Sequence, residues 1–319
     1  MNKKLITLLL SIFAFGTSAV LAQGKWNGES NTSFKYIFLE SLLNKKDKFK
    51  GGSELSQYVA SAESKSGFLP APSSGSAKVS IEPNTGASFA YTGKGDDLKL
   101  RAIASSSKAT HEEPASVSKF SIYGIKSSAV TSFFFTLDIN AFAQNGEIII
   151  PFGNTPDNAP DNGVTFNNSK QMSEWWDNEH LFGSIKLDVY DGVWIAYSYR
   201  RPRIGKLDTQ APRFVELKGP TPFIKGKSHQ VEIYCNNSET EQIYTRNGKS
   251  YIVLPQTYQW WVNDRKIVLD GDNYNFPATD ETPKGAAINS FSINTSGSSK
   301  PVANALEVTI SNISAHYVE

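Results

Sequence analysis

The chain has 319 residues, of which 39% are hydrophobic and 12% aromatic, enough for a sizeable apolar core. Its 32 lysines and arginines against 31 aspartates and glutamates give a net charge of +1, which argues against a general attraction to nucleic acid or to anionic membranes. The single cysteine, Cys235, excludes an intrachain disulfide, so the fold must depend on core packing.

The first 22 residues have the parts of a secretory signal peptide. Lys3 and Lys4 precede an apolar run, and small residues end at Ala22. The pattern predicts cleavage after Ala22 and export to the extracellular space or the periplasm. The run is too short to span a bilayer and no second run is long enough, so no membrane span is expected. Without the two lysines, 30 basic residues remain against 31 acidic ones, a net charge of −1.

Residues 23–66 form an N-terminal segment ahead of the predicted sandwich domain, residues 67–319. Phe34, Ile37, Phe38 and Leu42 have the spacing of an apolar helical stripe, interrupted by Ser41. This spacing predicts a short helix over residues 34–44. The segment is either a helix that covers one face of the sandwich or a separate leader.

Further along the chain, apolar and polar residues alternate in many segments rich in β-branched and aromatic side chains. A period of two predicts strands with one buried and one solvated face. Gly, Asn, Asp, Ser and Pro separate the segments, as in hairpins and loops. The pattern favours an all-β fold, an antiparallel β-sandwich or jelly roll. The clearest strand segments are 78–82, 88–92, 98–102, 132–138, 146–150, 184–190, 193–199, 229–234, 258–262, 288–293 and 305–310.

Cys235 lies in one of these segments and shares a strand face with Val231 and Ile233. We therefore interpret it as a small buried hydrophobic residue rather than a reactive thiol.

Three segments resemble the concanavalin A-like (laminin G-like) jelly rolls of secreted Bacteroidota proteins. The first is residues 68–79, where prolines precede a glycine and a strand. The second is residues 229–237 followed by 257–264, where tryptophan precedes a tight turn. The third, residues 306–314, resembles the closing strand that returns beside the first. The resemblance covers roughly residue 69 to the C-terminus. It implies glycan binding, adhesion or polysaccharide cleavage, and the fold does not choose among them.

Jelly-roll glucanases that resemble this fold carry Glu-x-Asp-x-Glu on one strand, so that nucleophile and acid share a face. Here Glu174, Asp177 and Glu179 have the spacing Glu-x-x-Asp-x-Glu, which puts Glu174 opposite the other two. The catalytic assignment of the glucanases therefore does not carry over, and a surface turn with buried tryptophans is the better interpretation.

A polysaccharide lyase of this fold needs a side chain that neutralises a uronate, plus His and Tyr for proton transfer. Tyr197 and Tyr199 share a strand face, but no motif links them to a histidine. A lone histidine is more often a structural or surface residue than a proton shuttle. If the chain is an enzyme, the candidate catalytic residues are His180, His229, Tyr197, Tyr199 and Arg200.

Tryptophan and arginine side chains are the candidate contacts to a glycan. Neighbours in a strand point to opposite faces, so one of Trp260 and Trp261 is expected in the core. The other is expected in solvent as a platform for a sugar, and core packing of both is the alternative. Arginine forks suit carboxylate or sulfate, although the cluster at residues 200–203 also fits a solvated strand end. The predicted contacts are Trp176, Trp260, Trp261, Tyr199, Arg200 and Arg203.

A structural calcium ion is possible at Asp270, Asp272 and Asn273, whose oxygens suit a hard cation. Residues 157–162 are a second such turn. Turns of this composition are also frequent without any metal.

Together these patterns predict a secreted, non-catalytic β-sandwich that binds a polysaccharide or cell-surface glycan, or another surface polymer. A jelly-roll lyase or glycoside hydrolase is the first alternative, and a structural or adhesive surface protein is the second. The sequence has no phosphate loop, dinucleotide fingerprint, His-Glu-x-x-His or Gly-x-Ser-x-Gly motif, which lowers the expectation of those enzyme classes.

Overall fold

The computed structural model describes residues 23–43, 48–50, 56–61, 63, 67–82, 86–104, 116–141, 146–156, 180–190, 193–199, 214–217, 220–269, 271–279, 281–297 and 306–319. This part of the chain is all-β, with two short 3-10 turns, η1 (Glu40–Leu42) and η2 (Gly95–Asp97). None of its helices is long and apolar enough to cross a membrane. The predicted signal peptide lies outside the described residues and stays a prediction.

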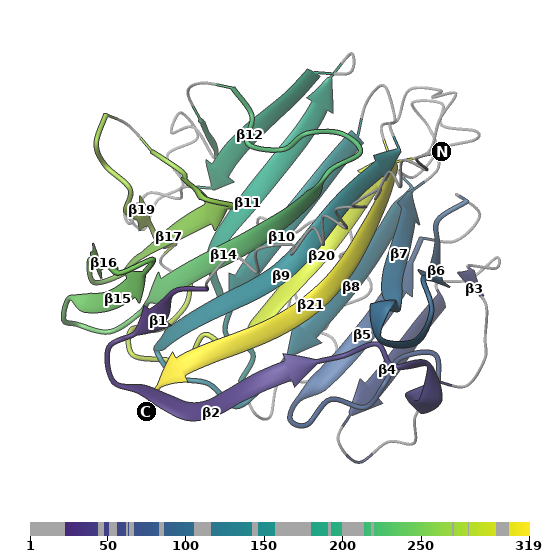
Figure 1. Cartoon of the computed structure of the whole chain (residues 1–319), viewed down its shortest axis with the longest axis horizontal. Helices are drawn as coiled ribbons and strands as arrows, with labels where there is room; N and C mark the ends of the chain where they lie inside the picture. The colour runs from purple at the N-terminus through teal and green to yellow at the C-terminus, as the bar shows by residue number, and fades with distance from the viewer. Residues whose placement is uncertain are drawn as a thin grey trace, which may run out of the picture.

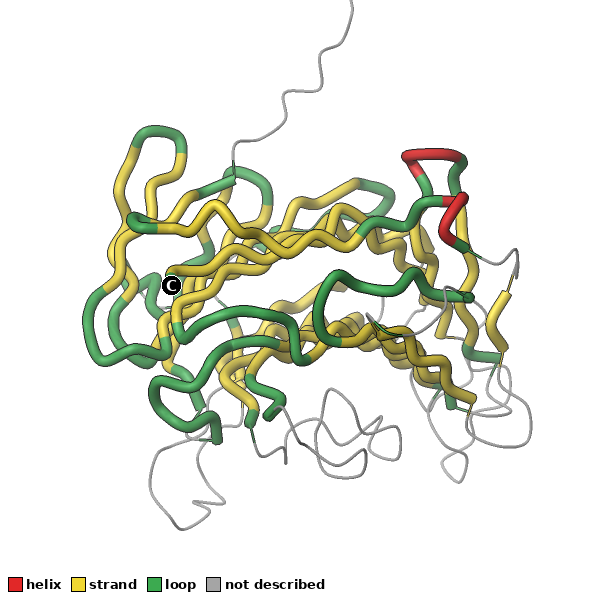
Figure 2. Tube along the Cα trace, turned by 90° about the horizontal axis from the view of Figure 1, so that it is seen from below, coloured by secondary structure: helices red, strands yellow, loops and turns green. Residues whose placement is uncertain are grey.

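Two large antiparallel sheets stack as the layers of a sandwich (Figure 1, Figure 2). The ten-stranded sheet has the order β18 (Arg265–Lys266), β17 (Thr257–Val262), β14 (Ser228–Asn236), β9 (Val130–Ala141), β21 (Leu306–Val318), β7 (Lys99–Ala104), β6 (Ser88–Thr92), β3 (Lys48–Lys50). Two further strands join it, β19 (Phe276–Pro277) beside β17 and β2 (Glu29–Tyr36) beside β21. The eight-stranded sheet has the order β13 (Phe214–Glu216), β12 (Val193–Tyr199), β11 (Leu181–Tyr190), β10 (Gly146–Gly153), β20 (Ser290–Gly297), β8 (Val117–Tyr123), β5 (Ser76–Ile81), β4 (Ser56–Ser61).

The main core lies between the two sheets and consists of alternate residues of each strand. In β9, for example, Phe133, Phe135 and Leu137 are almost fully buried in the same apolar cluster. In β20, Phe291 and Ile293 enter this cluster from the opposite sheet, and the rings of Phe135 and Phe291 stack. The predicted antiparallel β-sandwich is confirmed, because two antiparallel sheets enclose a core that alternate residues of their strands enter.

The predicted strand segments recur in the structure with modest changes at their ends. Residues 88–92 and 193–199 coincide with β6 and β12. The last segment is longer than predicted, since β21 continues to Val318 and pairs with β2, β7 and β9. Cys235 is fully buried beside Val231 and Ile233, as expected, and burial raises the pKa of its thiol. Cys235 is therefore part of the apolar core.

The helix predicted over residues 34–44 is wrong for the described residues 34–43. Phe34, Tyr36 and Phe38 are buried, whereas Lys35 and Ile37 between them are exposed, which is the alternation of an extended chain. Only η1 is helical here. Through β2, β3 and β4, the N-terminal segment supplies strands to both large sheets. Over so few residues, the spacing of the apolar side chains fits both a helix and a strand. The hydrogen bonds that β2 makes with β21 therefore decided in favour of the strand.

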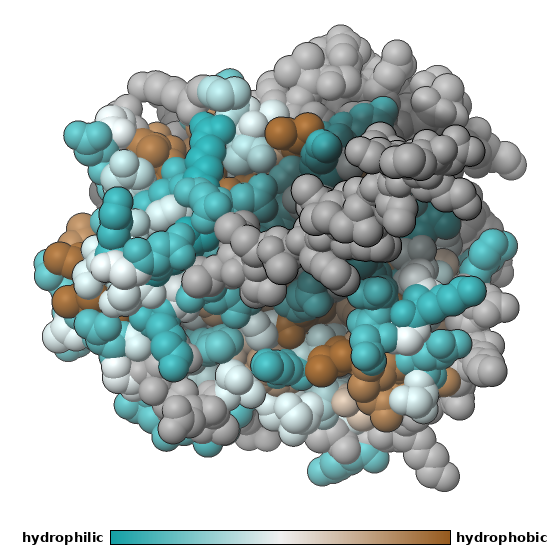
Figure 3. Space-filling model, viewed as in Figure 1, coloured by the Kyte–Doolittle hydropathy of each residue, from teal (hydrophilic) through white to brown (hydrophobic). Residues whose placement is uncertain are grey.

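A small third sheet, β1 (Lys25–Trp26), β15 (Gln242–Arg246) and β16 (Lys249–Val253), covers part of the outer face of the ten-stranded sheet. Trp26, Tyr244 and Val253 from this small sheet form a second apolar cluster with Phe134, Tyr234 and Trp261 of the large one. Figure 3 views this outer face, where hydrophilic residues dominate the described surface and a hydrophobic group lies near β15 and β16. The same sheet face is thus aromatic at one end and polar elsewhere.

Candidate functional site

The outer face of the eight-stranded sheet carries two lysines, an asparagine and an isoleucine in register across four neighbouring strands. Lys119 of β8 is opposite Asn294 of β20, Asn294 is opposite Ile149 of β10, and Ile149 is opposite Lys186 of β11. The residues next to each of them in sequence, such as Phe120 and Ile293, point into the core. These four residues therefore lie on the outer face, and we call them the lysine row.

A second cross-strand set lies beside the lysine row. Lys78 of β5 is opposite Ser121 of β8, which is opposite Ser292 of β20. Lys78 and Lys119 are 5% and 3% exposed, so two ammonium groups are buried on adjacent strands. Burial of like charges is costly unless other groups or a ligand stabilise them.

Several polar atoms on this face have no hydrogen-bond partner within the described structure. They include both amide atoms of Asn294 and the hydroxyls of Ser292 and Ser184. All three side chains are buried, and an unpaired buried polar group costs about 1–3 kcal/mol. Such groups are the expected signature of a ligand or water site.

The electrostatics of Lys119 follow from this arrangement. Burial, with the nearby charge of Lys78, lowers the pKa of Lys119 to about 7. An anion bound beside Lys119 would favour its protonated form and raise that pKa again. Binding of a carboxylate beside Lys119 at neutral pH would therefore increase the protonated fraction of this lysine.

A more accessible charged group lies at the other end of the lysine row. Glu147 of β10 is directly opposite Asp188 of β11, and an oxygen of each carboxylate is 3.4 Å from Nζ of Lys186. Burial, and to a smaller extent Asp188, raise the pKa of Glu147, while Lys186 opposes the shift. The group places a carboxyl with a raised pKa beside a second carboxyl group.

The register also relates this face to two predicted residues. Tyr197 of β12 is opposite Lys186, and Tyr199 is opposite Phe214 of β13. The backbone of β12 thus continues the sheet beyond the lysine row, while the side chains of Tyr197 and Tyr199 lie outside the described part. Their catalytic or binding role stays a prediction.

The two predicted histidines do not come together with each other. His229 lies in β14 of the ten-stranded sheet, is buried, and accepts a hydrogen bond at Nε2 from the backbone N–H of Ile224. Its Nδ1 donates to the carbonyl of Leu137, and burial lowers its pKa. His180 precedes β11 in a left-handed conformation, with φ of 89°. His229 therefore has the contacts of a neutral structural histidine.

Trp260 and Trp261 point to opposite faces, as strand geometry predicts, but neither is exposed. Trp260 is fully buried in the main core, and Trp261 is 6% exposed in the second cluster. The indole N–H of Trp261 donates to the hydroxyl of Tyr244 at 2.8 Å, and the Arg246 guanidinium lies 4.3 Å from its ring. The expectation of one solvent-facing ring is wrong because the small sheet covers it.

The remaining predicted residues lie partly outside the described structure. Trp176, Arg200, Arg203 and Asp270 are among the residues that are not described. Asp272 is exposed, and the side-chain oxygen of Asn273 accepts a hydrogen bond from the backbone N–H of Asn275. No group of three or more His, Cys, Asp or Glu residues in the described ranges is placed to hold a metal ion. Calcium binding at this turn stays a prediction.

Sequence reasoning missed the lysine row and the carboxylates beside it. Each member looks like an ordinary solvent-facing position in an alternating strand, as Lys186 and Asp188 do on either side of Leu187. The informative signal is their adjacency across β8, β20, β10 and β11, which are far apart in the chain. Only the strand order reveals it.

No family model matches the chain, and no curated protein matches it in sequence. Solved structures with a similar architecture are concanavalin A-like jelly-roll proteins. An alginate lyase, vAL-1 from Chlorella virus, is 15% identical over 72% of this chain and 88% of its own, with a TM-score of 0.38. The laminarinase from Rhodothermus marinus is 10% identical over 93% and 99%, with a TM-score of 0.42. Lectin II from Ulex europaeus is 10% identical over 89% and 98%, with a TM-score of 0.32. At these values the likeness concerns the architecture alone.

Proposed function

We propose that the protein, once exported, binds a carboxylated polysaccharide on the outer face of the eight-stranded sheet without cleaving it. The observation that carries this proposal is the set of buried polar atoms of Asn294 and Ser292 without a partner in the described structure. They lie beside two buried lysines, Lys78 and Lys119. A uronate carboxylate would accept from the amide N–H group of Asn294, the hydroxyl of Ser292 and the lysine ammonium groups, and a sugar hydroxyl would donate to the amide oxygen of Asn294.

The charge on this face favours an acidic ligand over a neutral one. Lys186 has two carboxylates against it, Glu147 and Asp188, whereas burial and the like charge of Lys78 lower the pKa of Lys119. A carboxylate at Lys119 would remove that like-charge penalty. Hydrogen bonds to a charged group in a buried site are worth about 1.5–3 kcal/mol each, enough for measurable affinity per sugar residue.

The experiment is a titration of the mature protein in native gels that contain alginate, pectate, a neutral glucan or a neutral xylan. We expect the uronate polymers to retard the protein while their size, followed by size-exclusion chromatography, stays constant. Lys119→Met combined with Asn294→Leu should weaken this retardation about 10-fold or more, because both proposed donors are lost.

The matched control is Lys249→Met, which removes an exposed lysine of the small sheet. It should leave retardation unchanged if the effect is local to the lysine row. Equal retardation by the parent and the Lys119→Met/Asn294→Leu variant would refute the site, and absence of retardation by every polymer would refute glycan binding.

A second candidate function is cleavage of the same kind of polymer. Glu147 and Asp188 favour it, because two carboxyls on adjacent strands share Lys186 and Glu147 has a raised pKa. A carboxyl with a raised pKa is suited to act as a general acid when a second carboxyl group lies on the neighbouring strand.

The test for cleavage follows reducing ends and the ultraviolet absorbance of unsaturated ends during incubation with each polymer. Activity that Glu147→Gln abolishes, with binding retained, would replace the binding proposal by an enzymatic one. Constant polymer size with the parent protein would leave binding alone.

A further inference from the structure

A cleft on the other sheet is independent of the proposed polysaccharide site. It arises where β21 changes partners: residues 306–310 pair with β7, and residues 313–318 pair with β2. A register shift separates Ser311 from Ser314, and Asn312 between them has a φ of 53°. The start of β7 and the end of β2 therefore meet at β21 without pairing with each other, which leaves a gap in the sheet.

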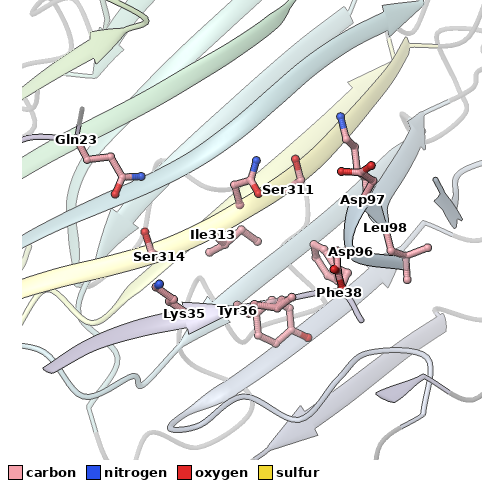
Figure 4. Close-up of a pocket in the computed structure, with 13 residues that line it drawn as sticks. Gln23, Lys35, Tyr36, Phe38, Asp96, Asp97, Leu98, Ser311, Ile313 and Ser314 are labelled. Carbon is pink, nitrogen blue, oxygen red and sulfur yellow. The ribbon is translucent and has the colours of Figure 1, made fainter. Parts of the chain in front are cut away.

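The gap is a cleft of about 350 Å³, within the size range of small-ligand sites. Figure 4 shows Asp96, Asp97 and Leu98 on the right, Lys35, Tyr36 and Phe38 of the β2 region below, and Ser311 of β21 above them. Asp96, Asp97, Lys35 and the apolar Ile37 are exposed. The cleft thus offers acceptors, donors and an apolar contact to one ligand.

An additional observation points to a ligand at this place. Ser311 is 5% exposed, lines the cleft, and has a hydroxyl without a hydrogen-bond partner in the described structure. Its neighbour Asn312 is already engaged, since its amide donates to the hydroxyl of Thr136 at 3.1 Å. The free hydroxyl of Ser311 is a polar group whose partner comes from outside the described chain.

The charges in the cleft disfavour a ligand that carries a single sign of charge. Lys35 opposes a cation, and Asp96 and Asp97 oppose an anion. Lys99, which also lines the cleft, is paired, with Nζ 2.9 Å from an oxygen of Asp138. What fits both signs is a neutral molecule with many hydroxyls, whose O–H groups donate to carboxylates and accept from an ammonium group.

We infer that this cleft binds one or two residues of a neutral sugar. Adjacent carboxylates of Asp96 and Asp97 accept from neighbouring hydroxyls, Lys35 donates, and Ser311 completes the contacts from the floor. Ile37, with half of its surface exposed, packs against the C–H face of the ring. The protein would then hold a neutral sugar on its ten-stranded sheet whether or not the eight-stranded sheet binds a uronate polymer.

The test is isothermal titration of the mature protein with neutral tetrasaccharides of glucose, mannose and xylose and with a tetrasaccharide of uronates. We expect a neutral tetrasaccharide to bind, and Asp96→Asn with Asp97→Asn to weaken it about 10-fold or more, since two charge-assisted contacts are lost. Ser311→Ala should weaken binding severalfold. Glu239→Gln, at an exposed bend elsewhere, is the matched control and should have no effect.

This experiment distinguishes failure of the cleft proposal from failure of the proposed uronate site on the eight-stranded sheet. Loss of neutral-sugar binding in the Lys119→Met/Asn294→Leu variant, but not in the Asp96→Asn/Asp97→Asn variant, would overturn the cleft assignment. So would the failure of every neutral tetrasaccharide to bind, or uronate binding that the Asp96→Asn/Asp97→Asn change strengthens. Thermal unfolding of each variant checks that the fold is intact, and Ser311→Ala supplies a small change if the double variant does not fold.

Discussion

Both large sheets bury charged side chains on their outer faces, but they do so in opposite ways. Against the ten-stranded sheet, Glu232 of β14 and Arg246 of the small sheet are 1% and 2% exposed and form an ion pair with N–O distances from 2.9 Å. On the eight-stranded sheet, Lys78 and Lys119 are buried on adjacent strands near Asn294, whose amide atoms have no hydrogen-bond partner in the described structure. The first arrangement pairs its buried polar groups, whereas the second leaves the Asn294 amide unpaired.

The satisfied pair has a full set of partners. Arg246 also donates to the carbonyl of Asn263 and to a carboxylate oxygen of Asp264, and Glu232 accepts from the hydroxyl of Tyr234. The backbone N–H of Gly24 donates to the same hydroxyl at 2.9 Å, which ties the described N-terminal end to the network. Complete satisfaction indicates a structural role, and incomplete satisfaction indicates a place for a ligand.

The largest effect should come from breaking the satisfied pair. Arg246→Leu leaves the Glu232 carboxylate buried without its partner, so we expect the free energy of unfolding in urea to fall by about 3–5 kcal/mol. Lys249→Leu, an exposed change in the same small sheet, should cost less than about 0.5 kcal/mol. Adding Glu232→Leu to Arg246→Leu should restore most of the loss, and a single change that costs under about 1 kcal/mol would contradict the comparison.

The next effect concerns the pH dependence of stability that the buried Lys119 causes. The pKa of Lys119 is lowered to about 7 in the folded protein, against the ordinary lysine value of 10.5, so between these values the unfolded chain binds the extra proton. Stability should therefore rise with pH across this interval, by up to about 1.4 kcal/mol per pH unit from this group.

Urea unfolding of the parent and of Lys119→Met at pH 7, 8 and 9 checks this prediction. The difference between the two curves isolates Lys119, because Lys266, whose pKa burial lowers to about 8, titrates in both proteins. Parallel curves for the two proteins would mean that Lys119 keeps its charge when folded.

A substitution at Asn294 is expected to stabilise the protein, whereas Arg246→Leu destabilises it, and the change in the free energy of unfolding should be smaller. Replacing its unpaired buried amide by an apolar side chain of similar size, Asn294→Leu, should raise the free energy of unfolding by about 1–3 kcal/mol while it weakens uronate binding. Asn236, buried on the other sheet, is the control, because its amide donates to the carbonyls of Thr240 and Val253. Asn236→Leu should destabilise the protein, and destabilisation by Asn294→Leu as well would remove the distinction.

Local patterns predicted most of the strands because the alternation of apolar and polar side chains can be seen in consecutive residues of the sequence. The segments at β6 and β12 match their strands, and the face of Cys235 follows from its neighbours Val231 and Ile233. The same reasoning failed at residues 34–43, where a few apolar residues fit two periods and pairing with β21 selected the strand. Local spacing is decisive only where it is long enough to exclude the other period.

The candidate sites were less predictable. Alternation places Trp261 on the outer face, but it does not say that Trp26, Tyr244 and Tyr251 pack there and exclude it from solvent. Nor does it reveal that Lys119 and Lys186, far apart in the chain, lie in one row. Tyr197 was a sequence candidate, and its register partner Lys186 emerged only from the sheet.

The sequence by itself determined the strands, the two faces of each strand and the burial of its single cysteine, since these depend on residues within a few positions of one another. The tertiary structure decided which strands are neighbours, which outer face is covered, and where β21 leaves a cleft between β7 and β2. The physical reason is that a strand specifies two faces through its own pleat, whereas the charge, burial and partners on each face come from strands brought in from elsewhere in the chain.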